Sequence, residues 1–351
     1  MRLQEQISQT RDVLEVNVYP RLSTRDLMSL SGSCRLFNEL TLRTRKSSEL
    51  MKRVICGEET RAESILESAP YLSLSRISKD RQTTDPSGQL ITGLTPFQAA
   101  LCAGDVEMCQ MMEPYIDQLK NGREVRQIQF REIFPQGLEE SVRSQKLAAS
   151  AFDFRPIVNA ITSATDLDVK AVLEKRDNGS VLCETLDIFR KAFKQCVTDE
   201  LVYNPYYLLR VFEIYDEQSD IWGGDKRHLF WRNVIGFVER FMPVCYAQAF
   251  ARGIYYIVEE DVALARSLNL RFGGESLYPL NFDFPIGLGF DYALGLTDGA
   301  LLQPQFAPLA TDGLQVELLT KFISSKNTRL GELLTGSPAI LSYRWSYTPY
   351  Q

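Results

Sequence analysis

The chain contains one histidine, His228, and this restricts the catalytic and metal chemistry that its side chains can perform. Nucleophilic catalysis by a cysteine needs a nearby base, so His228 would have to meet Cys183, Cys196 or Cys245 in the folded chain. The two basic residues that precede this histidine favour an exposed first helical turn instead. We therefore keep an enzyme with Cys/His chemistry in the C-terminal domain as an alternative and assign no catalytic residue.

Two further short motifs combine residue types that occur in active sites. The acidic run Glu259-Glu260-Asp261 could hold a cation or take part in acid–base chemistry, although such runs are usually solvated faces. The fragment Gly287-Leu288-Gly289 lacks the preceding βα unit, the third glycine and the later acidic residue of a dinucleotide-binding fingerprint. The sequence thus predicts no cofactor and no metal site.

The clearest pattern in the chain lies in residues 93–112. Thr95 can cap a helix that begins at Pro96, because proline at the first helical position loses no hydrogen bond. Small alanines let a second helix approach closely, and Gly104 ends the first helix, since a positive φ costs glycine least. The pattern predicts a helix hairpin built to stack, with structural positions at Gly93, Thr95, Pro96, Ala99, Ala100 and Gly104.

This hairpin resembles an ankyrin repeat. The segment Thr95-Pro96-Phe97-Gln98-Ala99 follows the T-P-L-H-x-A signature of the repeat and departs from it at two positions. Upstream, residues 50–72 show the same order of helix, glycine, helix and loop, and a polar linker follows at 80–93. We count about two repeats over residues 49–120, fewer than the three that a free-standing stack needs, so their ends should pack on neighbouring helices.

Residues 13–40 carry apolar side chains at three- and four-residue intervals, which indicates helix. Ser23 or Thr24 can cap this helix, and Asp26 lies in its positively polarised first turn. The spacing predicts a small helical hairpin with one apolar face within residues 1–48. Its candidate partner-binding residues are Leu14, Val18, Leu22, Ser23, Asp26, Leu27, Leu30, Cys34 and Phe37.

The N-terminal pattern resembles an F-box, the helical motif with which substrate adaptors dock on Skp1 in cullin–RING ubiquitin ligases. The Leu-Pro pair that usually starts the motif would fall on Thr10-Arg11, where this sequence differs. An amphipathic hairpin that only caps the ankyrin stack is the alternative. The positions that match the family are Val18, Leu22, Ser23, Asp26, Leu27, Leu30, Ser31, Cys34, Arg35, Phe37 and Leu40.

An F-box followed by a short ankyrin segment resembles the effector proteins that intracellular bacteria of the Legionella kind deliver into a host cell. The resemblance extends to segments 203–218 and 230–236. It implies a protein-interaction adaptor that docks on a Skp1-type partner and presents a host protein for ubiquitination in the reducing host cytosol. A scaffold without a link to a ubiquitin ligase is a further alternative.

Residues 121–351 predict a larger all-α domain of unknown role. Helical periods cover 138–152, 154–164, 166–176, 181–196, 205–216 and 229–258, and a final helix pair covers 314–324 and 328–334. The glycine- and aromatic-rich residues 266–296 predict an irregular segment or short strands. The fold class is therefore mainly α. A stripe of large apolar residues is assigned to the core: Phe230, Trp231, Val234, Phe237, Val238, Phe241 and Met242.

Composition restricts the partners and the compartment. The 351 residues are 44% hydrophobic with a net charge of −6, which disfavours nucleic acid, although the first 56 residues are modestly basic with ten Lys/Arg and six Asp/Glu. With no run of about 18 apolar residues and no leader pattern, the sequence predicts neither a membrane span nor a cleaved secretory signal. Seven scattered cysteines suggest reduced core thiols in a cytosolic setting.

Overall fold

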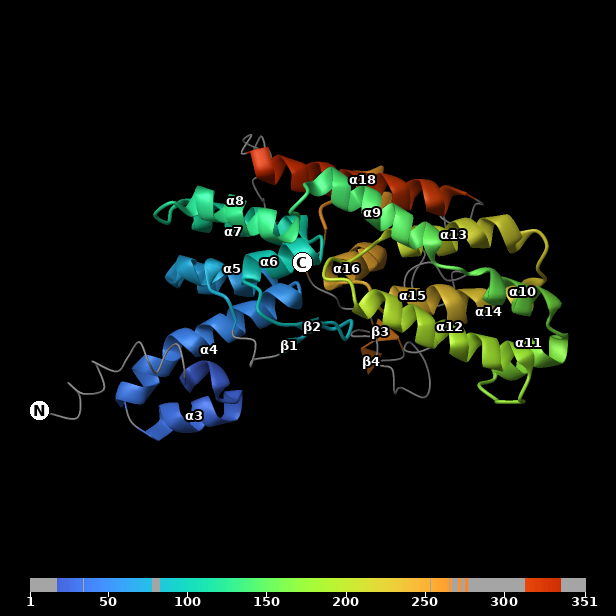
Figure 1. Ribbon diagram of the computed structural model, residues 1–351, viewed down its shortest axis with the longest axis horizontal. Coiled ribbons are helices and arrows are strands. Elements are labelled where there is room, and N and C mark those ends of the chain that lie inside the picture. The colour runs from blue at the N-terminus through green and yellow to red at the C-terminus, as the bar shows by residue number, and fades with distance from the viewer. Residues whose placement is uncertain are drawn as a thin grey trace, which may run out of the picture.

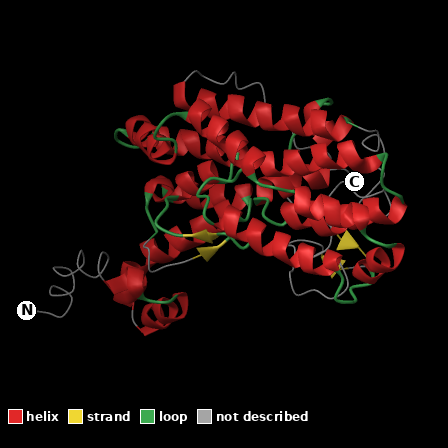
Figure 2. Cartoon of the chain, turned by 45° about the vertical axis from the view of Figure 1, so that its right-hand side comes forward, coloured by secondary structure: helices red, strands yellow, loops and turns green. Residues whose placement is uncertain are grey.

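The computed structural model describes residues 18–33, 35–77, 83–252, 254–264, 266, 271–272, 275–276 and 313–335. These residues are mainly helical, and Figure 1 shows the helices packed side by side in an elongated body. Within the described ranges, strands are confined to two short hairpins, drawn as arrows in Figure 2. The predicted mainly-α fold class is confirmed. No helix of this part of the chain is long and apolar enough to cross a membrane.

The described part of the N-terminal module consists of a 3₁₀ turn and two helices, of which the second is long. Its elements are η2 (Tyr19–Arg21), α3 (Thr24–Ser33) and α4 (Arg35–Ile55). The predicted boundary between residues 48 and 49 falls inside α4, so one continuous helix joins the two predicted segments. Leu50, Met51 and Val54 of the same helix are buried in the next core, which is why the helix continues without a break.

The predicted ankyrin segment forms stacked helix pairs. Its elements are α5 (Glu59–Ser68), η3 (Pro70–Leu74), β1 (Thr83–Thr84), β2 (Leu90–Ile91), α6 (Pro96–Cys102), α7 (Val106–Asp117) and α8 (Gly122–Ile133). α4 packs on α6, α5 packs on α7, and α8 packs on both α6 and α7. The predicted boundary at residue 120 therefore separates α7 from α8, although these helices share a core.

The predicted polar linker contains an antiparallel hairpin in which Thr83 pairs with Ile91. Asp85 shapes the turn, because its Oδ1 accepts hydrogen bonds from the backbone N–H groups of Ser87 and Gln89 at 2.9 Å each. Such an Asx turn gives a short loop an internal partner for its backbone donors. The linker is thus an ordered element of the stack over residues 83–91.

The C-terminal helices follow the predicted periods closely up to residue 219. Their elements are α9 (Leu138–Ala151), α10 (Arg155–Ser163), α11 (Asp166–Leu173), α12 (Val181–Thr198), α13 (Tyr206–Ser219), α14 (Gly224–Phe230), η4 (Trp231–Ile235), α15 (Gly236–Glu239), α16 (Val244–Arg252) and α17 (Ile254–Val258).

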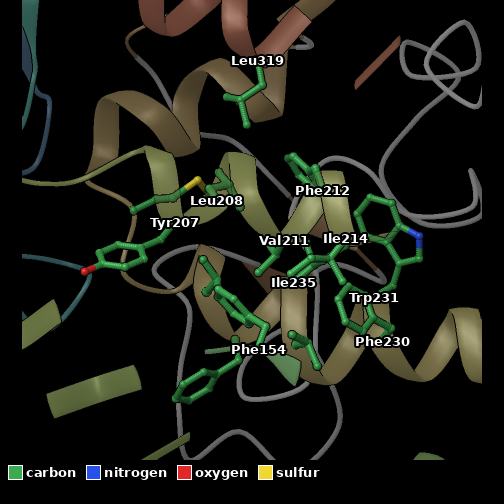
Figure 3. Close-up of a cluster of buried hydrophobic side chains, with 14 of the residues drawn as sticks. Phe154, Tyr207, Leu208, Val211, Phe212, Ile214, Phe230, Trp231, Ile235 and Leu319 are labelled. Carbon is green, nitrogen blue, oxygen red and sulfur yellow. The ribbon is translucent and has the colours of Figure 1, made fainter. Parts of the chain in front are cut away.

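The prediction of one helical period over residues 229–258 is wrong. A π-helical turn, η4, interrupts it, and the helix ends before Pro243, whose ring removes a backbone donor. The apolar stripe is nevertheless a core stripe, since Phe230, Val234 and Phe237 are buried and Phe241 packs against them in part. Figure 3 shows Phe230, Trp231 and Ile235 facing residues of α13 across this core.

The predicted final helix pair is one continuous helix, α18 (Leu314–Thr335). It contacts α7, α13 and α17 and lies along the top of the molecule in Figure 1. Leu318, Leu319 and Phe322 belong to the C-terminal core, whereas Leu330 and Leu333 belong to the core of the ankyrin-like segment. Because residues on both sides of the predicted break are buried in one core or the other, the helix continues through it.

Some predicted features lie outside the described residues. These are Leu14, Cys34, the Gly287-Leu288-Gly289 fragment and most of the predicted irregular segment. Within that segment, β3 (Arg271–Phe272) pairs antiparallel with β4 (Glu275–Ser276), so it does contain short strands.

Candidate partner-binding surfaces

The N-terminal module has a small core of its own. Tyr19 and Leu27 are buried, and Leu22, Leu30 and Phe37 pack against them in part. The pattern that predicted partner-binding residues therefore selected, in Leu27, a side chain that faces inward. The apolar period of a helix marks the side that is buried first by its own module.

The predicted cap of α3 is present at Ser23. Its Oγ accepts a hydrogen bond from the backbone N–H of Asp26 at 3.1 Å and donates one to the Asp26 carboxylate at 2.6 Å. Both side chains are exposed. They stabilise the start of the helix, and they remain accessible to a partner.

One predicted residue and one that was not predicted are exposed apolar side chains of the module. Val18, which was predicted, is 38% exposed, and Met28, which was not, is 61% exposed. Met28 directly follows the core residue Leu27. Successive residues of an α-helix are rotated by about 100°, so the Met28 side chain points away from the core. Met28 could have been identified from the sequence, because it is an apolar residue outside the buried stripe of its helix.

The residues around Thr95 lie in the cap of α6 and in its contacts with neighbouring helices. Thr95 caps α6 by accepting from the Gln98 N–H at 3.1 Å, and Gln98 returns the bond by accepting from the Thr95 N–H at 3.2 Å. Ala99 and Ala100 are buried at the contact between helices. Gly93 and Gly104 adopt φ values of 67° and 64°, which favour glycine.

The capping box also connects α6 to α8. The Thr95 hydroxyl donates to Gln129 Oε1 at 2.7 Å, and the Gln98 amide donates to Glu132 Oε2 at 2.6 Å. Thr95, Gln98 and Gln129 are buried, so these bonds replace those that water would make. Gln98, which stands at the histidine position of the T-P-L-H-x-A signature, therefore connects α6 to the next helix, α8.

A buried ionic cluster, which we call the junction network, was not predicted from the sequence. Lys326 is 2% exposed, and its Nζ lies 3.0 Å from Glu107 Oε2 and donates to the Gly104 carbonyl at 3.2 Å. Arg329 reaches the same carboxylate at 2.6 Å. The network consists of Glu59, Asp105, Glu107, Arg266, Lys326 and Arg329.

The second half of the junction network centres on Arg266. This guanidinium lies 3.0 Å from Glu59 and 2.7 Å from Asp105, the residue that caps α7. α5, α7 and α18 are thereby connected through charges from positions more than 150 residues apart. The one signal in the sequence was Lys326 itself, a charge in line with Phe322 and Leu330 at helical four-residue spacing.

We expect Glu59 to make stability fall as the pH rises. Burial raises its pKa from 4.5 to about 7 even though Arg266 lies beside it, and the carboxylates of Asp105, Glu107 and Glu63 act in the same direction. A carboxyl group with a raised folded-state pKa binds more protons when folded, so its stabilising contribution is lost between pH 4.5 and 7. The loss is at most about 3 kcal/mol.

The measurement is urea unfolding of the wild type and of Glu59→Gln at several pH values from 4.5 to 8. As the pH rises, the free energy of unfolding of the wild type should fall relative to that of Glu59→Gln. Parallel pH profiles would contradict the raised pKa.

The residues of the enzyme alternative are dispersed. His228 is exposed and forms no hydrogen bond or ion pair with any residue that the structure describes. Cys183 Sγ contacts Asn178 Oδ1 at 3.3 Å, and Cys196 Sγ contacts the Tyr207 hydroxyl at 3.0 Å. Burial raises the pKa of Cys245 to about 12, so its thiol stays protonated at neutral pH. The described residues thus provide no Cys/His pair.

The acidic run 259–261 is also engaged in surface contacts. Glu259 pairs with Lys321 at 2.8 Å, and Glu260 accepts from the Tyr255 hydroxyl at 3.4 Å. Within the described ranges, His, Cys, Asp and Glu form no group that could hold a metal ion. All six described cysteines are free thiols, and three of them, Cys102, Cys109 and Cys245, are buried.

Comparisons of the chain with protein-family models, with curated proteins and with solved structures found no match. The surfaces and contacts described above are therefore the basis for a functional assignment.

Proposed function

We propose that the chain is a protein-interaction adaptor that docks on a Skp1-type partner through its F-box-like N-terminal module. The surface around α3, which projects from the body in Figure 1, supports this proposal most directly. Met28 and Val18 are exposed there, while neighbouring Tyr19 and Leu27 fill the module's core. Exposed apolar side chains that gather into a contiguous patch mark protein contacts, and the proposal is that these side chains form part of such a patch.

The long α4 supports the presenting role of an adaptor. It runs without interruption from the module into the ankyrin-like core, where Leu50 and Met51 are buried. A continuous packed helix fixes the distance and direction between the docking module and the surfaces that would hold a target. In the proposed complex, this rigidity orients the bound host protein for ubiquitin transfer. The proposals of delivery by a bacterium and of action in the host cytosol rest on the family resemblance.

We expect Met28→Glu to weaken binding to purified Skp1 by more than about tenfold, because the new carboxylate would have to lose its water in an apolar contact. The matched control is Leu147→Glu, which makes the same kind of change at a 65% exposed leucine on α9. Biolayer interferometry with the immobilised full chain measures both affinities. Circular dichroism verifies that each variant is folded.

Leu27→Ala is unsuitable for this test, because Leu27 is 1% exposed and its loss would damage the module itself. A wild-type chain that does not bind Skp1 would contradict the adaptor proposal and favour a scaffold without a ligase link. Equal affinities for wild type and Met28→Glu would also contradict the proposed docking surface.

A further inference from the structure

A groove of about 1150 Å³ runs between α9, α13 and α18. α9 and α18 both pack on α13, which forms the floor of the groove. The two walls come together at one end, where a Cβ added to Gly331 would lie 4.0 Å from Leu138 Cδ2. The arrangement is that of a helix bundle with one position open.

The walls and floor combine apolar and small side chains. Leu138, Val142, Leu209, Ile323 and Leu334 supply the apolar surface. The groove is also lined by Ala149, Ser150 and Ser324, whose small side chains let a backbone approach closely. A cylinder of about 10 Å diameter and this volume is about 15 Å long, which corresponds to about ten residues of α-helix.

Charge is distributed along the groove in a way that specifies its occupant. The Lys146 ammonium lies 5.2 Å from the centre of the Tyr206 ring, and no carboxylate of the described residues lies within ion-pair distance of it. The Tyr206 hydroxyl accepts from Asn327 at 3.3 Å, which leaves its own proton available. Burial raises the pKa of Tyr206, so this hydroxyl stays a donor at neutral pH.

The end of the groove near Gly331 is lined by Glu139, a carboxylate of the opposite charge. Glu139 precedes Lys146 by seven residues on α9, which is two helical turns and about 10 Å. Arg210 is already paired with Glu213 and Glu217, so it leaves the charge pattern of Lys146 and Glu139 unchanged.

We propose that this groove binds an amphipathic helix of a partner protein that carries an acidic and a basic residue seven positions apart on its apolar face. The acidic residue pairs with Lys146 and the Tyr206 hydroxyl, and the basic residue faces Glu139. Leucine-like side chains between them fill the apolar part of the groove, in the manner of other helix-in-groove complexes. The inference does not depend on Skp1 binding, because the groove lies outside the N-terminal module.

The test uses a fluorescent helical peptide of about fourteen residues with leucines on one face and a Glu and a Lys seven positions apart among them. Fluorescence anisotropy with the full chain measures its affinity. Lys146→Glu should weaken binding at least fivefold, and a second peptide with Lys in place of the Glu should bind Lys146→Glu better than it binds the wild type. This exchange of charge tests the pairing itself, whichever way the helix runs.

The matched control is Arg143→Glu, which makes the same charge change one turn away on α9, outside the groove lining. Equal effects of the two substitutions, or no saturable binding of the peptide, would overturn the proposal. The peptide is also tested against a chain that ends at residue 335. If the peptide binds this shortened chain and does not bind the full chain, the groove belongs to the chain's own C-terminal residues. A dimer that Lys146→Glu dissociates would assign it to a second copy. Either result would overturn a partner helix.

Discussion

Replacing Glu107 with alanine is expected to destabilise the protein by about 3–5 kcal/mol, because it leaves the ammonium of Lys326 buried without its counter-charge. Lys326 is 2% exposed, and its other contacts among the described residues include the Gly104 carbonyl and the rings of Tyr246 and Phe322 at 5.4 and 5.2 Å. These contacts replace only part of the lost ion pair. Urea unfolding of the full chain measures the loss, and Glu67→Ala at an exposed site of α5 is the matched control.

The double variant Glu107→Leu with Lys326→Met distinguishes the effect of the ion pair from that of side-chain packing, because it removes both charges and keeps side chains in both places. Because removing both charges leaves no buried unpaired ion, this variant should be more stable than Glu107→Ala. If Glu107→Ala costs no more than the exposed control, the ion pair does not stabilise the junction between α7 and α18.

The same carboxylate should make the protein sensitive to acid. Burial alone would raise the pKa of Glu107, but Lys326, Arg329 and Arg266 outweigh this effect and hold the pKa well below its ordinary value of 4.5. A lowered folded-state pKa contributes stability above pH 4.5 that is lost as the pH falls further. The difference in the free energy of unfolding between the wild type and Glu107→Ala should therefore become smaller as the pH falls below 4.5.

Phe193→Ala is the second substitution with a large expected effect, a loss of about 3–5 kcal/mol in the free energy of unfolding. The Phe193 ring is 1% exposed, and its centre lies 5.3 Å from that of Phe152, 5.4 Å from that of Tyr207 and 5.7 Å from that of Phe241. These rings come from four separate segments of the chain and pack edge to face, so removal of one opens a cavity that none of the others can fill.

The control for this prediction is Ile188→Ala, at a 66% exposed isoleucine on the same helix, α12. It changes helix composition without opening the core and should cost less than about 1 kcal/mol. Phe193→Leu should give an intermediate loss. Equal losses for Phe193→Ala and Ile188→Ala would contradict the assignment of Phe193 to the core.

Local patterns predicted those parts of the fold that depend on neighbours in sequence. The caps at Ser23 and Thr95, the glycine at Gly104 and the C-terminal helical periods up to residue 219 all occur where expected. Each depends on interactions within a few residues, which the order of residue types specifies directly. The break predicted within α18 failed because a helix that reaches two cores follows the distant surfaces that cover it.

The candidate binding surfaces show the same division. Leu27 and Met28 are adjacent apolar residues of one helix, and their sequence spacing alone does not tell which of them faces the module's core. Lys146 and Tyr206 likewise meet only because α9 packs on α13.

The sequence by itself determined a mainly helical protein with capped helices, a stacking hairpin around Thr95 and an N-terminal apolar pattern. Only the tertiary structure decided that α4 joins two predicted domains, that Lys326 meets Glu107, and that a groove stays open between α9, α13 and α18. The physical reason is that helix formation is governed by contacts within about one turn, whereas charge pairing and groove shape depend on which distant helices share a core.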